Sequence, residues 1–307
     1  MRKPRALRPG DRVAVVAPAS HFARDEFDAG VTELRALGFD PVFDDSVFAR
    51  ERFVAGSAAV RAAALEAAWA DPSVAAIVAV RGGWGSAQVL PLLDADAIRG
   101  TDKIFVGFSD LTAILTFLTI GCGLVAFHGP MLAGRLGRGE AGYHRESFMR
   151  AVGRAAPMGD LAPAGLEALR AGEAAGPLLG GTLTQIVSSL GTPYAFAPPA
   201  GHVLWLEDVG ERPYRLDRMV TQLKQAGILG RAAAVVIGTM PNCDEPGTDH
   251  TARATMAEAL SDFGGPVLFG FPSGHASGPT WTLPLGVTAR VVADARPRLV
   301  IEESAVV

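Results

Sequence analysis

The chain has 307 residues, which is long enough for two domains with separate hydrophobic cores. Apolar residues make up 49% and charged residues 20%, a balance typical of globular rather than disordered proteins. The net charge is -4 and the arginines are scattered, so no clustered basic surface suggests a nucleic-acid partner.

The N-terminal segment favours a first β-strand over a signal peptide. Its apolar run is short, follows Asp11 and Arg12, and ends in a Pro-Ala-Ser turn. No apolar stretch is long enough to span a membrane. Cys122 and Cys243 lack the spacing of paired ligands or of a disulfide framework. We therefore expect a cytoplasmic protein without metal, cofactor or membrane contact.

The first half of the chain alternates short apolar runs with amphipathic segments. This pattern predicts a parallel sheet covered by helices on both faces. Helices are expected at residues 27–38 and 56–71, where apolar side chains recur at helical spacing. Strands are expected at residues 12–19, 40–44, 74–80, 103–108 and 123–129.

Small or polar residues follow four of these expected strands. They are the segments 17–20, 81–86, 109–110 and 128–130. In open sheets of this kind, ligands bind outside the carboxyl ends of the strands. The four segments therefore predict a binding or catalytic site at one edge of the sheet.

Periodicity is weak from about Met131 to Gly176, apart from a short helix expected around Arg145 to Arg154. We divide the chain into a domain at 1–150, a crossover at 151–176 and a domain at 177–307. In the last of these, helices are expected at 214–229 and 251–263. Its expected strands are 202–208, 232–240, 266–271, 286–295 and 298–303.

Ser109 lies in "FVGFSDLT" (residues 105–112), where an expected strand meets an expected helix. Serine is a favoured helix cap, and at a sharp corner it can also be an exposed nucleophile. The G-x-S-x-G elbow motif is not met, because Leu111 stands at its last position. The segment alone leaves both interpretations open.

A nucleophilic serine needs a base and a carboxylate that orients the base. His275 lies in the Pro- and Gly-rich loop "FGFPSGHASGPTW", and His128 ends an expected strand. Glu207 ends the apolar strand "HVLWLE", beside Asp208. The plainer alternatives are a surface histidine and a strand that ends in two solvated acids.

Seven segments, taken in order, resemble the LD-carboxypeptidases, serine peptidases of murein recycling that are related to microcin C self-immunity proteins. They are "GDRVAVVAPAS", "AVRGGWGSAQVLPLLD", "FVGFSDLTAIL", "FHGPML", "GGTLTQIVSSLGTPY", "LWLEDVGERPYRLDRMVTQL" and "GFPSGHASGPTWTLPLG". We accordingly expect an α/β protein. Its N-terminal domain would have a parallel, flavodoxin-like sheet, and its C-terminal mixed α/β domain a β-rich, barrel-like core.

The resemblance implies that Ser109 is the nucleophile, His275 the general base and Glu207 its orienting carboxylate. It also implies an oxyanion hole, for which we choose the amides of Asp110 and Gly83, the latter over Gly82. The implied reaction removes a terminal D-amino acid from an L-residue, as in a murein tetrapeptide. The resemblance further suggests a homodimer.

Recognition of a free carboxylate calls for a nearby cation. Arg81 and Arg212 are the candidates, together with Arg215, for which a surface role is the better interpretation. Trp84 stands where the family often has tyrosine, and Thr182 where it commonly has asparagine. Both departures concern specificity more than chemistry.

Two alternatives remain open at this stage. One is a self-immunity type hydrolase of aminoacyl or peptidyl nucleotides, with Trp84 stacking on the base. The other is a non-catalytic module that binds a small ligand, which would not need Ser109, Glu207 and His275 together.

Overall fold

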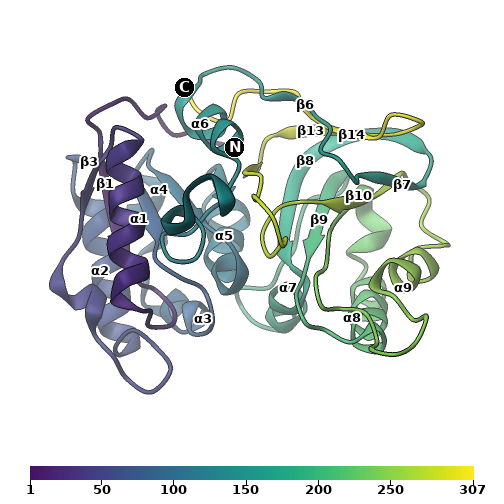
Figure 1. The fold of residues 1–307 in the computed structure, drawn as a ribbon, viewed down its shortest axis with the longest axis horizontal. Coiled ribbons are helices and arrows are strands. Elements are labelled where there is room, and N and C mark those ends of the chain that lie inside the picture. The colour runs from purple at the N-terminus through teal and green to yellow at the C-terminus, as the bar shows by residue number, and fades with distance from the viewer.

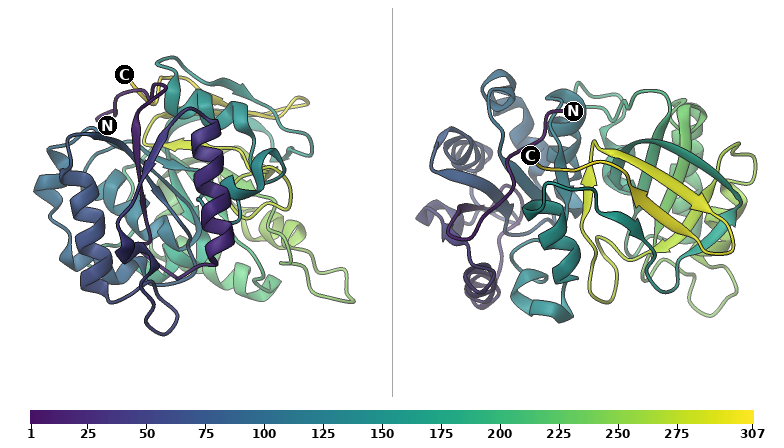
Figure 2. Two further views of the ribbon diagram at one scale, coloured as in Figure 1. Left: turned by 60° about the vertical axis from the view of Figure 1, so that its left-hand side comes forward. Right: turned by 90° about the horizontal axis from the view of Figure 1, so that it is seen from above.

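The computed structural model describes all residues 1–307. The chain forms two halves that lie side by side, each built on its own β-sheet (Figure 1). The two ends of the chain are paired with each other, since the Ala6 amide donates to the Val307 carbonyl and the Val307 amide donates to the Pro4 carbonyl. Both ends therefore lie together at the junction of the halves (Figure 2).

The first sheet has six strands in the order β2-β1-β3-β4-β5-β12. The strands β2, β1, β3, β4 and β5 run parallel, in the order typical of flavodoxin-like sheets. The expected α/β, parallel-sheet architecture of the N-terminal half is therefore confirmed. These strands are β1 (Arg12–Val16), β2 (Asp40–Val42), β3 (Val74–Ala79), β4 (Ile104–Gly107) and β5 (Ala126–His128).

Helices cover both faces of this sheet (Figure 2). The first helix buries Phe27, Val31 and Leu34, which recur at helical spacing and give it one apolar face. The second begins at a Ser57 cap, whose hydroxyl accepts a bond from the Val60 amide at 3.3 Å. The helices are α1 (Arg24–Ala36), α2 (Ala58–Ala70), α3 (Ser86–Val89), α4 (Ala95–Arg99), α5 (Thr112–Thr116) and α6 (Arg145–Gly153).

The second sheet is mixed and has eight strands in the order β6-β14-β13-β8-β9-β10-β11-β7. Strands β8 to β11 run parallel, and the remaining pairs are antiparallel. The sheet is curled, since β13 also contacts β11 and β7, which are not its neighbours in the strand order. Its strands are β6 (Gly159–Leu161), β7 (Glu167–Arg170), β8 (Gly172–Thr182), β9 (His202–Glu207), β10 (Ala232–Gly238), β11 (Val267–Phe271), β13 (Thr288–Ala293) and β14 (Arg298–Ile301).

The segment 151–176 contains β6, β7 and the first residues of β8. All four residues of β7 are partly or fully exposed, so the segment lacks the apolar alternation by which strands are recognised. Helices α7 (Leu183–Ser189), α8 (Pro213–Gln225) and α9 (Ala252–Ala259) lie together on one side of this half (Figure 1).

The two halves share a continuous core, and the second half of the chain contributes one strand to the first sheet. A single cluster of 69 buried residues extends from β1 in the first half to β13 in the second. Strand β12 (Leu283–Leu285) comes from the end of the chain and pairs antiparallel with β5 of the first sheet. Helix α5 of the first half also packs against β8 and α7 of the second. These contacts fix the junction at which the candidate site lies.

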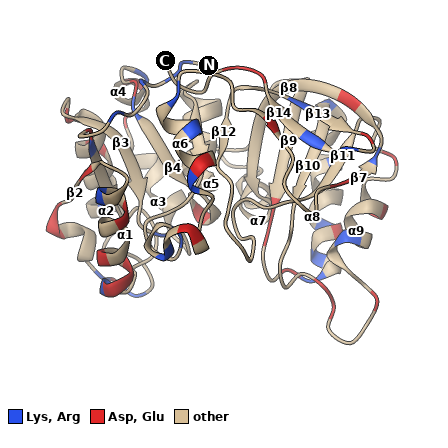
Figure 3. Ribbon diagram, turned by 45° about the horizontal axis from the view of Figure 1, so that its top comes forward, with Lys and Arg blue, Asp and Glu red and all other residues tan.

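Charged residues of both signs are distributed over both halves (Figure 3). None of the helices combines the length and the apolar content that a membrane crossing requires.

Candidate active site

Ser109 stands at a strained corner between β4 and α5. Its φ is +65°, a left-handed conformation that is costly for any residue with a side chain. Gly82 lies so close that a Cβ there would be 2.9 Å from the Ser109 Cβ and 3.1 Å from its Oγ. Backbone strain at a partly buried corner of this kind is more frequent at functional sites than at ordinary helix starts.

The Ser109 hydroxyl does not cap the helix that follows it. No side-chain cap is formed at the start of the short helical turn Ser109–Leu111 or of α5. The hydroxyl Oγ instead lies 3.1 Å from Nε2 of His275. Of the two interpretations that the sequence left open, the helix cap is therefore wrong.

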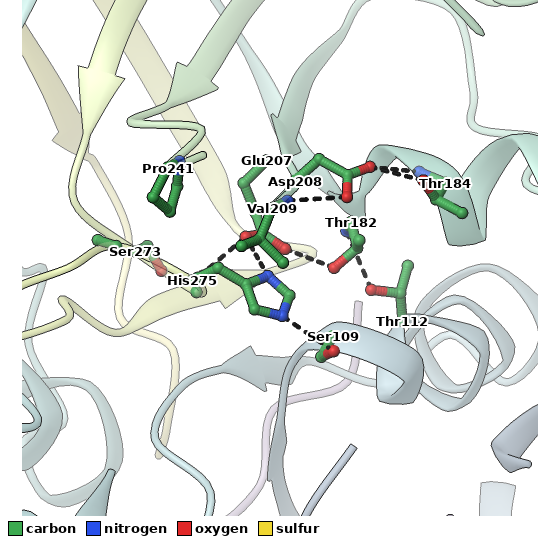
Figure 4. A network of polar contacts seen from close by, with 12 residues as sticks. Ser109, Thr112, Thr182, Thr184, Glu207, Asp208, Val209, Pro241, Ser273 and His275 are labelled. Carbon is green, nitrogen blue, oxygen red and sulfur yellow. Dashed lines mark hydrogen bonds and ion pairs between the residues drawn. The ribbon is translucent and has the colours of Figure 1, made fainter. Parts of the chain in front are cut away.

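His275 and Glu207 meet in the second half of the molecule and face Ser109 (Figure 4). The Nδ1 atom of His275 lies 2.8 Å from Oε2 of Glu207. The backbone amide of His275 donates to the same oxygen at 3.0 Å. Since a carboxylate only accepts, Nδ1 carries the proton, and Nε2 is left to accept one from the Ser109 hydroxyl.

Gly274 makes this approach of loop and carboxylate possible. Its φ is +66°, and a Cβ at this position would lie 2.6 Å from Oε2 of Glu207. It would also lie 2.9 Å from Cε1 of His128. A side chain here would push the histidine away from the carboxylate, so glycine is required before His275.

Glu207 and Asp208 are both buried, at 1% and 4% exposure, so the strand does not end in two solvated acids. Burial raises the pKa of Glu207, but the hydrogen bonds from His275 and Thr182 and the electrostatic interaction with the neighbouring imidazoles outweigh it and lower that pKa to about 2. The Thr182 hydroxyl donates to its second oxygen, Oε1. Glu207 is therefore a fixed anion behind the histidine.

Asp208 faces away from the histidine and holds helix α7. Its Oδ2 accepts bonds from the amide and hydroxyl of Thr184, both at 2.8 Å, and its Oδ1 accepts from Val209. Burial raises the pKa of Asp208 to about 6, against these bonds. Glu207 thus binds the histidine of the candidate site, whereas Asp208 binds the start of helix α7 and stabilises the fold.

His128 lies on the other side of Glu207 and is fully buried. The Ser273 hydroxyl donates to the Trp281 carbonyl at 2.7 Å, so it accepts from Nδ1 of His128 at 3.1 Å. The other nitrogen, Nε2, has no hydrogen-bond partner and lies 4.0 Å from Oε1 of Glu207. Burial lowers the pKa of His128 to about 4, so it stands neutral behind the carboxylate.

We expect His128→Asn to change the acid sensitivity of the fold. Below pH 6.5 the histidine of the unfolded chain takes up a proton, whereas the buried His128 of the folded protein stays neutral until the pH falls toward 4. The contribution of His128 to the free energy of unfolding is therefore at its full value above pH 6.5 and decreases as the pH falls from 6.5 toward 4. Asparagine has no proton to gain, so the stability margin of the wild type over the variant should shrink between pH 7 and pH 4.5. The change should reach at most about 3 kcal/mol, at about 1.4 kcal/mol per pKa unit.

Denaturant unfolding of both proteins at several pH values measures this margin. Asp208 has a raised pKa and acts in the opposite direction, losing stability as the pH rises from 3.8 toward 6. Because Asp208 is present in both proteins, its contribution cancels in the comparison. A margin that stays constant with pH would contradict a neutral, buried His128.

The candidates for the oxyanion hole and the pocket wall differ in their burial and in their hydrogen bonds. Asp110 is buried and its carboxyl accepts from the Ser86 amide at 2.8 Å. Gly83 has a φ of +94°, and its backbone amide donates to no group of the chain. The backbone amide of the next residue, Trp84, donates to the Ser20 hydroxyl at 3.1 Å. Trp84 is 45% exposed.

The three arginines differ in their partners. Arg81 is exposed and makes only a 3.5 Å contact with the His21 carbonyl. Arg212 is paired with Glu245, and Arg215 with Glu211 at 3.4 Å. Of the three arginines, Arg81 alone has no acidic partner.

The sequence analysis overlooked one residue beside the site, Arg135. Its guanidinium binds the carbonyls of Gly274 and Ala276, on either side of His275. It lies in the segment of weak periodicity after β5, where nothing in the spacing distinguishes it. The role of Thr182 as a donor to Glu207 was likewise not expected, although Thr182 itself was noted.

A serine, a histidine and a buried carboxylate in hydrogen-bonded series are the arrangement that serine hydrolases use. Family models match both halves of the chain: the LD-carboxypeptidase N-terminal domain at residues 13–129, and the LD-carboxypeptidase C-terminal domain at residues 175–291. The chain belongs to the LD-carboxypeptidase family, Peptidase S66.

Relatives support this assignment over most of the chain. It is 33% identical over 286 residues to the murein tetrapeptide carboxypeptidase of Pseudomonas aeruginosa, covering 91% of this chain and 92% of that protein. The microcin C7 self-immunity protein MccF of Escherichia coli is 26% identical over 314 residues, covering 94% and 91%.

Among solved structures, the muramoyltetrapeptide carboxypeptidase of Oxalobacter formigenes superimposes with a TM-score of 0.83 at 27% identity, covering 95% of this chain and 99% of that one. It shares the α/β fold with a mostly parallel N-terminal sheet and a mixed C-terminal sheet.

Proposed function

We propose that this protein is a serine-type LD-carboxypeptidase that removes the terminal D-alanine of a murein tetrapeptide by cleaving an L,D-peptide bond. The observation that carries the proposal is the series from Ser109 Oγ to His275 Nε2 at 3.1 Å and from His275 Nδ1 to Glu207 Oε2 at 2.8 Å. The similarity to the murein tetrapeptide carboxypeptidase of Pseudomonas aeruginosa supports the choice of substrate class.

In this mechanism Ser109 attacks the carbonyl of the L-residue while its proton passes to Nε2 of His275. The charge that develops on the imidazole is stabilised by Glu207, which stays ionised and accepts hydrogen bonds from the Nδ1–H and the backbone N–H of His275. Phe108 packs edge-on against the imidazole, with ring centroids 5.1 Å apart, and restricts its rotation.

The tetrahedral intermediate needs donors for its oxyanion. We assign this role to the amides of Gly83 and Asp110, since the first has no partner in the chain and the second follows Ser109 directly. The protonated His275 then donates to the leaving amine of D-alanine. Water, activated by the same histidine, releases the L-terminated peptide from Ser109.

The free carboxylate of the departing D-alanine needs a cation at the edge of the site. Arg81 is exposed and lies in the turn that leads to Gly83, whereas Arg212 is already paired with Glu245. We therefore propose Arg81 for the carboxylate and Trp84 for the wall of the pocket.

Two tetrapeptides that differ only in the chirality of the last alanine test the proposal. Release of alanine from the D-terminated peptide, and not from its L epimer, is the expected result in a chromatographic assay of products. Equal release from both, or from neither, would refute an L,D-carboxypeptidase.

A second candidate is hydrolysis of an aminoacyl or peptidyl nucleotide, as in the self-immunity branch. Its support is the exposed indole of Trp84 beside Gly83, which could stack on a base. The same assay with an aminoacyl nucleotide in place of the peptide distinguishes the two substrates. For either substrate we propose a cytoplasmic, homodimeric enzyme.

A further inference from the structure

The candidate triad is divided between the two halves of the molecule. Ser109 follows β4 of the first sheet, whereas Glu207 ends β9 of the second and His275 lies in the loop 272–282. We call this segment, between β11 and β12, the histidine loop. The distance from Ser109 to His275 therefore depends on how the histidine loop is held against the first half.

Arg135 reaches the histidine loop from the first half of the chain. It lies between β5 and α6, and its Nη2 donates to the carbonyl of Gly274 at 2.9 Å and to that of Ala276 at 2.8 Å. Its Nη1 donates to the carbonyl of Gly278 at 3.3 Å. Nη2 thus fastens the backbone on both sides of His275 while Nη1 binds a third carbonyl, a fork that the single nitrogen of a shorter lysine side chain does not reproduce.

The same guanidinium is linked to the nucleophile by packing. Its Cζ lies 5.8 Å from the ring centroid of Phe108, and that ring packs edge-on against His275. Phe108 directly precedes Ser109 in the chain. Arg135, Phe108 and His275 therefore form one packed group that joins the serine corner to the histidine loop.

The far end of the histidine loop is held independently of Arg135. The backbone amide of His144 donates to the carbonyl of Thr280 at 2.9 Å, and the amide of Thr282 donates to the Ser147 hydroxyl at 3.1 Å. The rings of His144 and Trp281 stack at 4.3 Å. These contacts keep the loop attached when the side chain at position 135 is changed, so only its His275 end should lose its support.

We propose that Arg135 is a positioning residue that sets the alignment of His275 with Ser109 through the backbone of the histidine loop. The expected loss of kcat rests on the proposed function, whereas the alignment of His275 with Ser109 by Arg135 does not depend on it. Because a displacement of about 1 Å can cost about a hundredfold in rate, loss of the guanidinium should lower kcat about 10- to 100-fold. KM should change less than about twofold, since the hydrogen bonds of the Arg135 side chain all go to backbone carbonyls of the chain itself.

The test compares Arg135→Met and Arg135→Lys with Arg138→Met, a matched control three residues further along. Arg138 is exposed and its side chain makes no hydrogen bond. Both Arg135 variants should lose kcat with KM nearly unchanged, and lysine should not restore it. Full kcat in Arg135→Met, rescue by lysine, or an equal loss in Arg138→Met would overturn the proposal.

A crystal structure of Arg135→Met gives a readout that does not depend on the substrate. The distance from Ser109 Oγ to His275 Nε2, 3.1 Å in the wild type, should exceed hydrogen-bonding range. An unchanged distance would refute the positioning role. If the wild type hydrolysed no murein peptide but this distance still lengthened in the variant, the proposed function would fail and the role of Arg135 would stand.

Discussion

The Ser109→Ala variant should fold like the wild type and lose turnover by at least about 10⁴-fold. Alanine occupies the left-handed corner at the same backbone cost as serine, because both carry a Cβ. The hydroxyl makes no cap, so its loss removes only the contact with His275. The measurement is kcat on murein tetrapeptide, together with thermal unfolding of both proteins.

Ser57→Ala is the matched control for this experiment. Ser57 is a genuine helix cap, since it accepts from the Val60 amide at the start of α2. Its replacement should cost about 1 kcal/mol of stability and leave kcat unchanged. If Ser109→Ala behaved like Ser57→Ala, with lower stability and full turnover, the nucleophile assignment would be wrong.

Glu207→Gln should lower kcat by about 10³- to 10⁴-fold while the protein stays folded. A glutamine oxygen can still accept from His275, and its amide can donate to the Thr182 hydroxyl, which then turns from donor to acceptor. The shape of the site survives, but the negative charge that stabilises the imidazolium is gone. Steady-state kinetics should therefore show a loss in kcat larger than any change in KM.

Asp208→Asn provides the comparison for Glu207→Gln. Asp208 is equally buried and adjacent in sequence, but it binds Thr184 and Val209 instead of the histidine. Its replacement should affect the stability of the fold and reduce kcat by less than about tenfold. Equal losses in the two variants would show that the rate depends on buried charge in general rather than on the carboxylate behind His275.

The elements that build the site could largely be predicted from the sequence, because each is local. Buried runs such as residues 103–108 and 202–207 are followed by polar residues, and parallel strands present such residues at one edge. The Pro- and Gly-rich surroundings of His275 likewise marked a loop of special backbone shape, which Gly274 at φ +66° exemplifies.

The contacts that join the two halves could not be predicted in this way. Arg135 acts on backbone carbonyls about 140 residues away, which have no side-chain signature in the sequence. Strand β12 has only three residues, and its pairing with β5 follows from tertiary packing rather than from its own pattern. The engagement of Arg212 by Glu245 also depends on a loop conformation that spacing does not reveal.

The most direct test of the account is mass spectrometry of murein tetrapeptide after incubation with wild-type protein and with Ser109→Ala in parallel. We predict that the wild type removes one D-alanine residue and that Ser109→Ala leaves the tetrapeptide intact. Cleavage by both proteins at equal rates would contradict a Ser109 nucleophile. An intact tetrapeptide with the wild type would contradict the murein carboxypeptidase itself.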